Sequence, residues 1–387
     1  MKKILAKMDE YKEKIISIRR HIHMYPDLSG EEKPTRDYVK DILESNGIKT
    51  KTFKDNYALV SEIITDEKKP FLAFRADMDA LPIQEENHVS YASKKKGVMH
   101  ACGHDAHTAI LTGVMLFLNE IKENLNINIR GIFQHKEEVF EGGSSDLIKV
   151  GVLENVKEIY GLHMYPYLKT GEIGYKYGEM MASADMFEIE IFGKSAHGAR
   201  PHEGVDAILT ASMAVNSINH IVSRRIDPLH PAVISFGTIE GGKAPNIICD
   251  HVKLSGTVRT LNDKVRSDIK KMTEDAVSGI AKSMGAEYKF HYYYGNSELI
   301  NTKECVDKII NNAKMLGIKP VDLVQPVMGG EDFAEYLKVV KGAYFRLGCC
   351  SKIKDTCYPQ HHPKFNIDED SLLLGAKILA SLALDEK

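Results

Sequence analysis

Short apolar runs alternate with helical segments along the first half of the chain, and this alternation limits the possible folds more than any other feature. Four runs, at 57–64, 71–75, 127–134 and 158–163, are typical of buried strands. Between the second and third runs, the spacing of apolar residues predicts a long helix at 107–125. Strands that alternate with helices predict an α/β domain with a largely parallel sheet flanked by helices.

The pattern of apolar residues changes after residue 182. Phe187, Ile189 and Ile191 alternate with acidic residues, which is typical of a strand with one exposed face. We therefore expect an inserted α+β domain with a ferredoxin-like βαββαβ order at 183–296, within a first domain made of 1–182 and 297–387. The elements predicted after the first inserted strand are a helix at 205–225, strands at 233–239 and 252–260, a helix at 263–284 and a strand at 287–293.

The two ends of the chain contribute further elements to the first domain. Apolar residues at steps of three and four predict one amphipathic helix over 3–23. In the carboxyl-terminal part we expect helices at 303–315 and 369–384 and a strand at 343–347. Ahead of that strand, Glu331 and Asp332 are expected to cap a short helix.

Composition and charge exclude several classes of partner. The 387 residues include 51 basic and 54 acidic side chains without a basic block, so we expect no nucleic-acid partner. No apolar run reaches the roughly 18 residues that a membrane helix needs, so we expect no membrane partner. Charged residues such as Lys7 and Asp9 interrupt the amino-terminal apolar stretch, which argues against a secretion signal. The six cysteines form no regular framework, which favours the reduced cytoplasm.

A cluster of potential metal ligands lies at 99–108, where the long helix is expected to begin. It contains Cys102, His104, Asp105 and His107, and this combination of thiolate, imidazole and carboxylate suits zinc, manganese or a similar divalent ion. A structural role is the alternative, because His107 can pack or cap and Asp105 can serve as a helix amino-terminal charge. The cluster alone does not decide between the two.

Other candidate ligands follow the predicted strands directly. Asp77 and Asp79 come after the strand that ends at Arg75, and the pair Glu137-Glu138 follows the next strand of the sheet. Ligands bind beyond the carboxyl ends of strands in open α/β sheets, so we expect these side chains to share one edge with His163. In a loop, one glutamate of the pair can ligate an ion while the other removes a proton from the attacking water.

Seven motifs, distributed in order along nearly the whole chain, resemble those of the N-acyl-amino-acid amidohydrolases. This family forms the hippurate hydrolase, auxin-conjugate hydrolase and N-acetyldiaminopimelate deacetylase branch of the aminoacylase and carboxypeptidase superfamily of two-metal hydrolases. The motifs are RADMDALP at 75–82, MHACGHDAH at 99–107, GLH at 161–163, GKSAHGARPH at 193–202, APN at 244–246, GTVRT at 256–260 and MGGEDF at 328–333.

The resemblance implies a site for two divalent metal ions, with zinc or manganese favoured over nickel or cobalt. Cys102 corresponds to a thiolate that bridges the two ions. The other implied ligands are His104, Glu138, His163 and His361.

The resemblance also implies catalytic and substrate-binding roles. Glu137 corresponds to the general base, and Asp79 to a carboxylate that orients a neighbouring ligand. His197, in the inserted lid and dimerisation domain, corresponds to the residue that stabilises the oxyanion, often in the partner's active site. Asn246 and Arg259 would bind the substrate. The implied protein is a homodimer that cleaves the amide bond of N-acyl amino acids.

The sequence departs from the family pattern at two places. His135-Lys136 replaces the usual Pro-Ala before the glutamate pair, which makes His135 a rival ligand or a neighbour of the ligands. Gln360 replaces the leucine that usually precedes the last ligand. Two alternatives therefore stay open. One is a dipeptidase or carboxypeptidase that uses the same site on a short peptide, and the other is an inactive protein that binds a metal or an amino acid.

Overall fold

The computed structural model describes residues 1–386, which form two compact units. Unit 1 consists of Met1–Gly178, Ile300–Gln325 and the chain from Asp332 onward, and unit 2 consists of Glu179–Leu299 and Pro326–Glu331. The connecting segments contain strands β7 (Gly178–Met181) and β14 (Leu299–Asn301). Among the described residues, no helix has both the length and the apolar character that a membrane span requires.

An eight-stranded sheet forms the centre of unit 1, in the order β1-β2-β4-β3-β5-β16-β6-β15. The four central strands β4, β3, β5 and β16 are parallel, which confirms the prediction of a largely parallel sheet. Antiparallel pairing occurs only towards the two sides of this sheet. The strands are β1 (Lys49–Thr52), β2 (Leu59–Ile63), β3 (Phe71–Asp77), β4 (Asn128–Gln134), β5 (Val156–Lys169), β6 (Glu172–Tyr175), β15 (Lys319–Asp322) and β16 (Lys341–Cys350).

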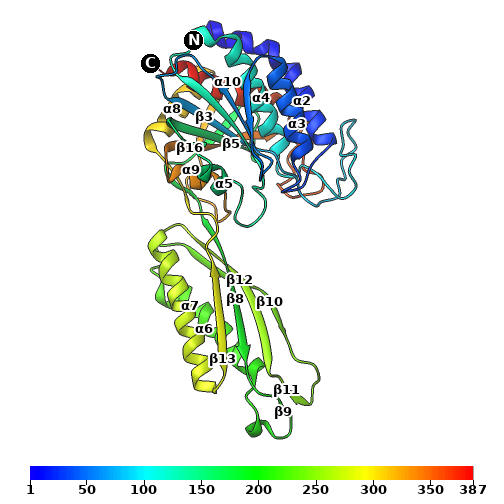
Figure 1. The fold of residues 1–387 in the computed structure, drawn as a ribbon, viewed down its shortest axis with the longest axis vertical. Helices are drawn as coiled ribbons and strands as arrows, with labels where there is room; N and C mark the ends of the chain where they lie inside the picture. The colour runs from blue at the N-terminus through cyan, green and yellow to red at the C-terminus, as the bar shows by residue number, and fades with distance from the viewer. Residues whose placement is uncertain (387) are drawn as a thin grey trace. The chain divides into compact units, whose positions relative to one another are not determined.

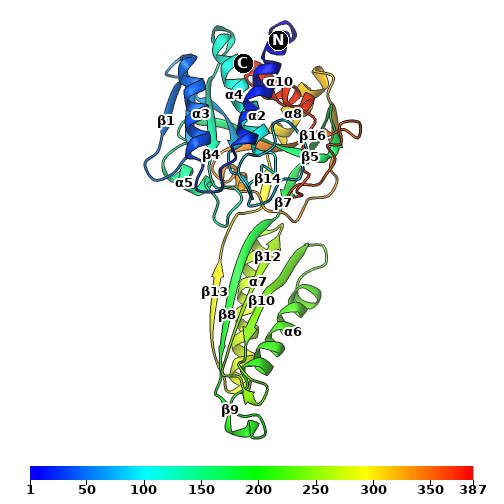
Figure 2. The same ribbon diagram turned by 90° about the vertical axis from the view of Figure 1, so that its right-hand side faces the viewer.

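Helices flank this sheet, and α4 is the most deeply buried of them. Helices α2, α4 and α10 pack against one another, and the amino-terminal helix α1 also contacts α10 (Figures 1 and 2). Fifteen consecutive residues of α4 are buried, which explains why its sequence is apolar on all sides. The α-helices of unit 1 are α1 (Lys2–Ala6), α2 (Lys12–Met24), α3 (Lys33–Ser45), α4 (His104–Glu120), α5 (Ser144–Lys149), α8 (Lys303–Met315), α9 (Phe333–Leu337) and α10 (Asp370–Asp385).

Unit 2 has the predicted ferredoxin-like order. Its antiparallel sheet, β10-β12-β8-β13, carries α6 and α7 on one face (Figure 1). The residues of β8 are alternately buried and half-exposed, so that Phe187, Ile189 and Ile191 face the helices. The elements are β8 (Ser183–Phe192), β9 (Ala196–His197), α6 (Ala207–Arg225), β10 (Ala232–Gly241), β11 (Ile247–Ile248), β12 (His251–Thr260), α7 (Asp263–Met284) and β13 (Glu287–Tyr293).

Several local predictions were wrong. The single helix expected over 3–23 is interrupted by a 3-10 segment at Lys7–Tyr11, which buries Met8. Helix α4 begins at His104, before the expected start, because Gly103 provides a left-handed turn there. Asp332 stands at the amino-terminal cap position of α9, but its side chain makes no cap hydrogen bond.

One disulfide was also missed, because its spacing matches no recognised framework. Cys350, at the end of β16, is bonded to Cys357 seven residues later. The other four cysteines, Cys102 among them, are free and buried. A cytoplasmic location stays a prediction from the cysteine pattern.

Two helical glycines give a direct test of the packing between α2 and α4. A Cβ atom on Gly113, in α4, would collide with the side chain of Ile15, whereas Gly279, in α7, has open space around it. We expect Gly113→Ala to lower the free energy of unfolding by roughly 1–3 kcal/mol through overpacking. Gly279→Ala should raise it by about 0.5–1 kcal/mol, because alanine favours helix. Denaturant unfolding of the wild type and of both variants measures these changes in the free energy of unfolding. The same change in both variants would contradict this packing.

Candidate functional site

The carboxyl ends of three parallel strands bring the predicted residues of unit 1 together. Asp77 is the last residue of β3, and the Glu137-Glu138 pair follows the end of β4. The pairing of Arg75 with Gly161 places His163 of β5 level with Asp77. These side chains therefore share one edge of the sheet, as expected for a ligand site in this kind of fold.

The start of α4 supplies two further side chains at the same edge. Gly103, the amino-terminal cap residue, has a φ of 94°, and a Cβ atom there would lie 3.0 Å from the Met164 side chain. Only glycine adopts this conformation without strain. The turn places Cys102 and His104 on either side of the helix start, next to β5.

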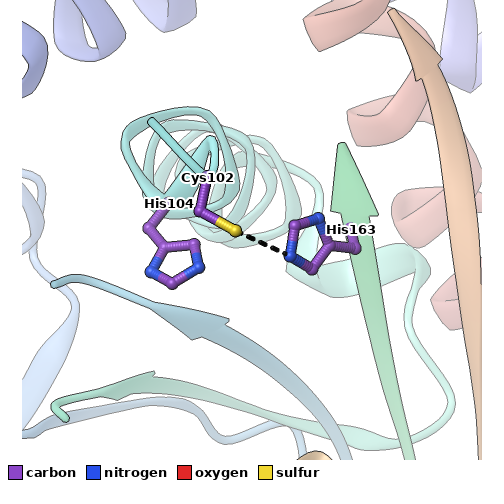
Figure 3. A group of neighbouring side chains, drawn as sticks. All are labelled: Cys102, His104 and His163. Atoms are coloured by element: carbon purple, nitrogen blue, oxygen red, sulfur yellow. Dashed lines mark hydrogen bonds between the residues drawn. The ribbon is translucent and has the colours of Figure 1, made fainter. Parts of the chain in front are cut away.

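Cys102 and His163 face each other (Figure 3), with 3.4 Å between Sγ and Nε2. The other ring nitrogen of His163, Nδ1, lies 2.9 Å from the backbone oxygen of Met164, to which it can donate a hydrogen bond. Burial, together with His107 and Arg346, lowers the pKa of His163 well below its ordinary value. A neutral ring that donates from Nδ1 presents the Nε2 lone pair towards Cys102, as a metal ligand must.

His104 and Glu138 are both held by Asp79. The His104 Nδ1 atom lies 3.1 Å from Oδ1 of Asp79, and the backbone N–H of Glu138 donates to Oδ2 at 2.9 Å. The remaining atoms, Nε2 of His104 and Oε1 of Glu138, are 3.7 Å apart. Both are buried, and neither has a hydrogen-bond partner. Two such atoms left unsatisfied side by side are costly, and a bound cation would satisfy both.

His361 completes the group from the carboxyl-terminal part of the chain. Its backbone N–H donates to the Ala101 carbonyl at 2.8 Å, which ties the residue to the segment before Cys102. Its Nε2 atom lies 3.5 Å from Oε1 of Glu138. With a φ of 64°, His361 has a left-handed backbone that non-glycine residues seldom adopt.

Three groups of potential metal ligands overlap at this point. One consists of Cys102, His104 and His163, and a second of Cys102, Glu138 and His361. The third joins Glu137 to His104 and Glu138, and within each group the ligand atoms lie within 4.8 Å of one another. Cys102 belongs to two groups. Together these groups offer sulfur, nitrogen and oxygen ligand atoms, a mixture that suits zinc or a similar ion. Burial, followed by Glu138, raises the pKa of the Cys102 thiol well above its ordinary value, so a thiolate here needs a cation beside it.

His107 forms a further candidate group with Asp77 and His104, but its own contacts already use both of its ring nitrogens. Its Nδ1 donates to Asp77 at 2.5 Å, and its Nε2 accepts the backbone N–H of Met164 at 2.8 Å. Both ring nitrogens are therefore engaged, and burial lowers the pKa of the ring. Of the two readings that the sequence left open for His107, the packing role agrees with these contacts.

The sequence analysis missed the side chains that close the loop carrying Glu137 and Glu138. Oδ2 of Asp332 accepts the backbone N–H groups of Gly143 and Ser144, both at 3.0 Å, and the Gln134 amide at 2.6 Å. Oδ1 of Asp332 accepts a hydrogen bond from the Arg75 guanidinium at 2.6 Å. Asp332 thus joins both ends of the loop instead of capping α9. Its buried ion pair with an arginine far away in sequence has no local sequence signal.

The two departures from the family pattern take up positions beside the ligands. His135 is buried, and burial and then Lys136 lower its pKa to about 4. It belongs to none of the ligand groups found among residues 1–386, so its expected role as a rival ligand finds no support there. The Gln360 side chain lies 3.1 Å from Nδ1 of His163 and 3.3 Å from the Met164 oxygen.

The three predicted residues of unit 2 do not form one cluster within that unit. His197, in β9, is exposed and pairs with Ile247, the residue after Asn246. The β9–β11 pair lies at one end of the unit 2 sheet (Figures 1 and 2). Arg259 is half-buried near the other end of β12, about 26 Å along the strand from His251.

Comparisons with known proteins identify the family of this chain. The profile of "Peptidase family M20/M25/M40" matches residues 73–385. YhaA of Bacillus subtilis (strain 168) is 41% identical over 384 residues, which are 99% of this chain and 97% of YhaA. The N-acyl-L-amino acid amidohydrolase of Geobacillus stearothermophilus is 41% identical over 77% of this chain and 80% of its own.

Two solved structures have the same fold over almost their whole length. A crystal structure from methicillin-resistant Staphylococcus aureus has a TM-score of 0.95 and 33% identity, and it covers 99% of both chains. The Bacillus subtilis YxeP protein, described as a dinuclear metal-binding peptidase from the M20 family, has a TM-score of 0.85 and 32% identity, with 97% of this chain and 98% of YxeP covered. The chain therefore belongs to peptidase family M20/M25/M40.

Proposed function

We propose that this protein is a metal-dependent amidohydrolase that cleaves the amide bond of N-acyl amino acids and releases a free amino acid and a carboxylic acid. One observation supports this proposal above all others. Cys102, His104, Glu138, His163 and His361, which come from four separate segments of the chain, converge at one sheet edge with Glu137 beside them. The N-acyl-L-amino acid amidohydrolase that shares 41% of the aligned residues supports the substrate class.

Two divalent cations would be held by the five converging side chains, with Cys102 shared between them. The dinuclear metal named for the related YxeP protein supports this number, and the mixed donor set favours zinc or manganese, with nickel or cobalt as alternatives. When bound, such cations polarise the scissile carbonyl and lower the pKa of water.

Glu137 is the proposed general base. It lies within 4.8 Å of the ligand atoms of His104 and Glu138, on a loop closed by buried contacts. From this position it removes a proton from the attacking water and delivers it to the leaving amine. Asp79 is a positioning residue, because it holds the His104 ring and the Glu138 backbone at the same time.

Unit 2 supplies the proposed substrate contacts. His197 would stabilise the oxyanion, and Asn246 would bind the substrate next to it. Arg259 would pair with the substrate carboxylate. Since Arg259 lies near the opposite end of its sheet from His197, we propose a homodimer through unit 2 in which His197 of one copy serves the partner's site.

A panel of substrates tests the reaction itself. The protein is stripped with a chelator, reconstituted with zinc or manganese, and assayed on N-acetyl amino acids, N-benzoyl amino acids and dipeptides. We expect hydrolysis of N-acyl amino acids to disappear with the metal and to return on reconstitution. Exclusive turnover of dipeptides would identify a dipeptidase instead. Metal binding without turnover of any substrate would identify an inactive binding protein.

The proposed base is tested by Glu137→Gln. We expect kcat to fall by about 10²–10⁴-fold, because the amide cannot accept the proton, while bound metal stays unchanged. Elemental analysis and steady-state kinetics give both values. Glu141→Gln, at an exposed position of the same loop, is the matched control and should retain wild-type kcat. A fully active Glu137→Gln enzyme would remove this residue from the mechanism.

The shared ligand is tested by Cys102→Ser. A serine hydroxyl is a poor substitute for a thiolate, so we expect less than half of the wild-type metal content after dialysis. Cys305→Ala removes another buried free thiol, outside the site, and should leave the metal content unchanged. Wild-type metal stoichiometry in Cys102→Ser would rule out the shared-ligand role.

A further inference from the structure

Glu32 is a buried carboxyl group that the proposed reaction does not use. It stands at the amino-terminal cap position of α3 and is 0% exposed, but its side chain makes no cap hydrogen bond. Instead, Oε1 accepts two backbone N–H groups at 2.8 Å, one from Gly30 and one from Lys136. The second contact crosses 104 residues of sequence and ends on the loop of the glutamate pair.

The contact with Lys136 holds a residue whose backbone conformation is unfavourable. Lys136 precedes Glu137 and has a φ of 59°, a left-handed conformation that costs free energy for any residue with a Cβ atom. Two residues later, the backbone N–H of Glu138 is held by Asp79. The peptide N–H groups of Lys136 and Glu138, the residues before and after Glu137, are therefore each anchored to a buried carboxyl group.

The two anchors belong to one local structure. The hydroxyl of Ser29 donates to Oδ2 of Asp79 at 2.7 Å, and Leu28 forms a β-bridge with Ala80. The short segment from Leu28 to Glu32 thus carries one of the two carboxyl groups that hold the loop, that of Glu32, and contacts the other, that of Asp79. A rigid second layer of this kind is what keeps a catalytic group within a few tenths of an ångström of its working position.

The second oxygen of Glu32 takes no part in these contacts. Oε2 is buried and has no hydrogen-bond partner. Burial raises the pKa of Glu32 to about 7, even though the two N–H donors oppose this rise. Because both backbone N–H groups meet the same oxygen, a glutamine amide of almost the same shape can accept them in place of the carboxyl group.

We propose that Glu32 is a positioning residue that holds the Lys136 peptide in its left-handed conformation and thereby directs Glu137 towards the reacting water. This inference rests on the proposed amidohydrolase function. Glu32 binds neither metal nor substrate, and it acts only through the loop backbone. Its loss should therefore lower kcat without changing KM or the amount of bound metal.

Four variants of the full-length, metal-reconstituted protein test this role, with the best N-acyl amino acid of the panel as substrate. Glu32→Ala should lower kcat by about 10–100-fold, as expected for a misplaced catalytic group, with KM within about threefold of wild type. Glu32→Gln should stay within about fivefold of the wild-type kcat. Aspartate suits a helix cap and so preserves folding, but it is too short to reach Lys136. Glu32→Asp should therefore lower kcat by about the same factor as Glu32→Ala. The exposed neighbour gives the control, Glu31→Ala, which should behave as wild type.

Hydrogen exchange provides a readout that does not depend on turnover. Peptides that cover residues 135–143 should exchange at least about tenfold faster in Glu32→Asp and Glu32→Ala than in wild type or Glu32→Gln, because the Lys136 amide loses its acceptor. If Glu32→Asp keeps wild-type kcat and exchange, or if Glu32→Gln is as impaired as Glu32→Asp, the positioning role is wrong. A parallel loss of metal from the impaired variants would also overturn it. If the wild-type protein hydrolyses nothing in the panel, the proposed function fails while the exchange data still decide whether Glu32 holds the loop.

Discussion

Two fully buried carboxylates at the carboxyl end of β3, Asp77 and Asp79, are the constraint around which the site of unit 1 is built. A buried carboxylate without a partner costs several kcal/mol, so each must be paired. Asp77 pairs with Arg75 and His107, and Asp79 with His104, with Ser29 and with the backbone of Glu138. These pairings fix the start of α4 against the sheet and the glutamate loop against β3.

The proposed metal ligands differ in how much support they need. His163 lies within β5 and His104 is the first residue of α4, so both belong to regular elements, and Cys102 lies two residues before that helix. Glu138 and His361 lie on loops, and each has an additional tie to a buried group. Glu138 is held by Asp79 through its own N–H, and His361 by the carbonyl of Ala101. A site on loops reaches the precision of one on regular elements only through such ties.

Patterns local in sequence predicted much of this molecule, and contacts distant in sequence were missed. The periods of apolar residues predicted the βαββαβ order of unit 2 and the central strands and long helices of unit 1, but they gave no prediction for α3 or for the outer strands β1, β6 and β15. The rule for strand ends placed Glu137, Glu138 and His163 at one edge. The motifs of a resembling family supplied His361, which has no local signal of its own. Nothing near Asp332 or Glu32 reveals their partners, which lie 189 and 104 residues away along the chain. The sequence analysis expected Asp332 to cap a helix, because a polar residue before a helix is usually a cap, and it gave no role to Glu32.

The balance of charge connects these two distant contacts to the proposed metal ligands. Among the ion pairs of residues 1–386, Arg75 binds Asp77 and Asp332, whereas Asp79 and Glu138 are paired only with histidines. Acidic groups therefore exceed cationic side chains at this edge, and a divalent cation is the simplest way to offset the excess. Glu32 lies close enough to Asp79 for that carboxylate to raise its pKa. The contact between Glu32 and the Lys136 N–H needs only an acceptor oxygen, which the neutral and the ionised carboxyl group both provide, so Glu32 can hold the loop in either form.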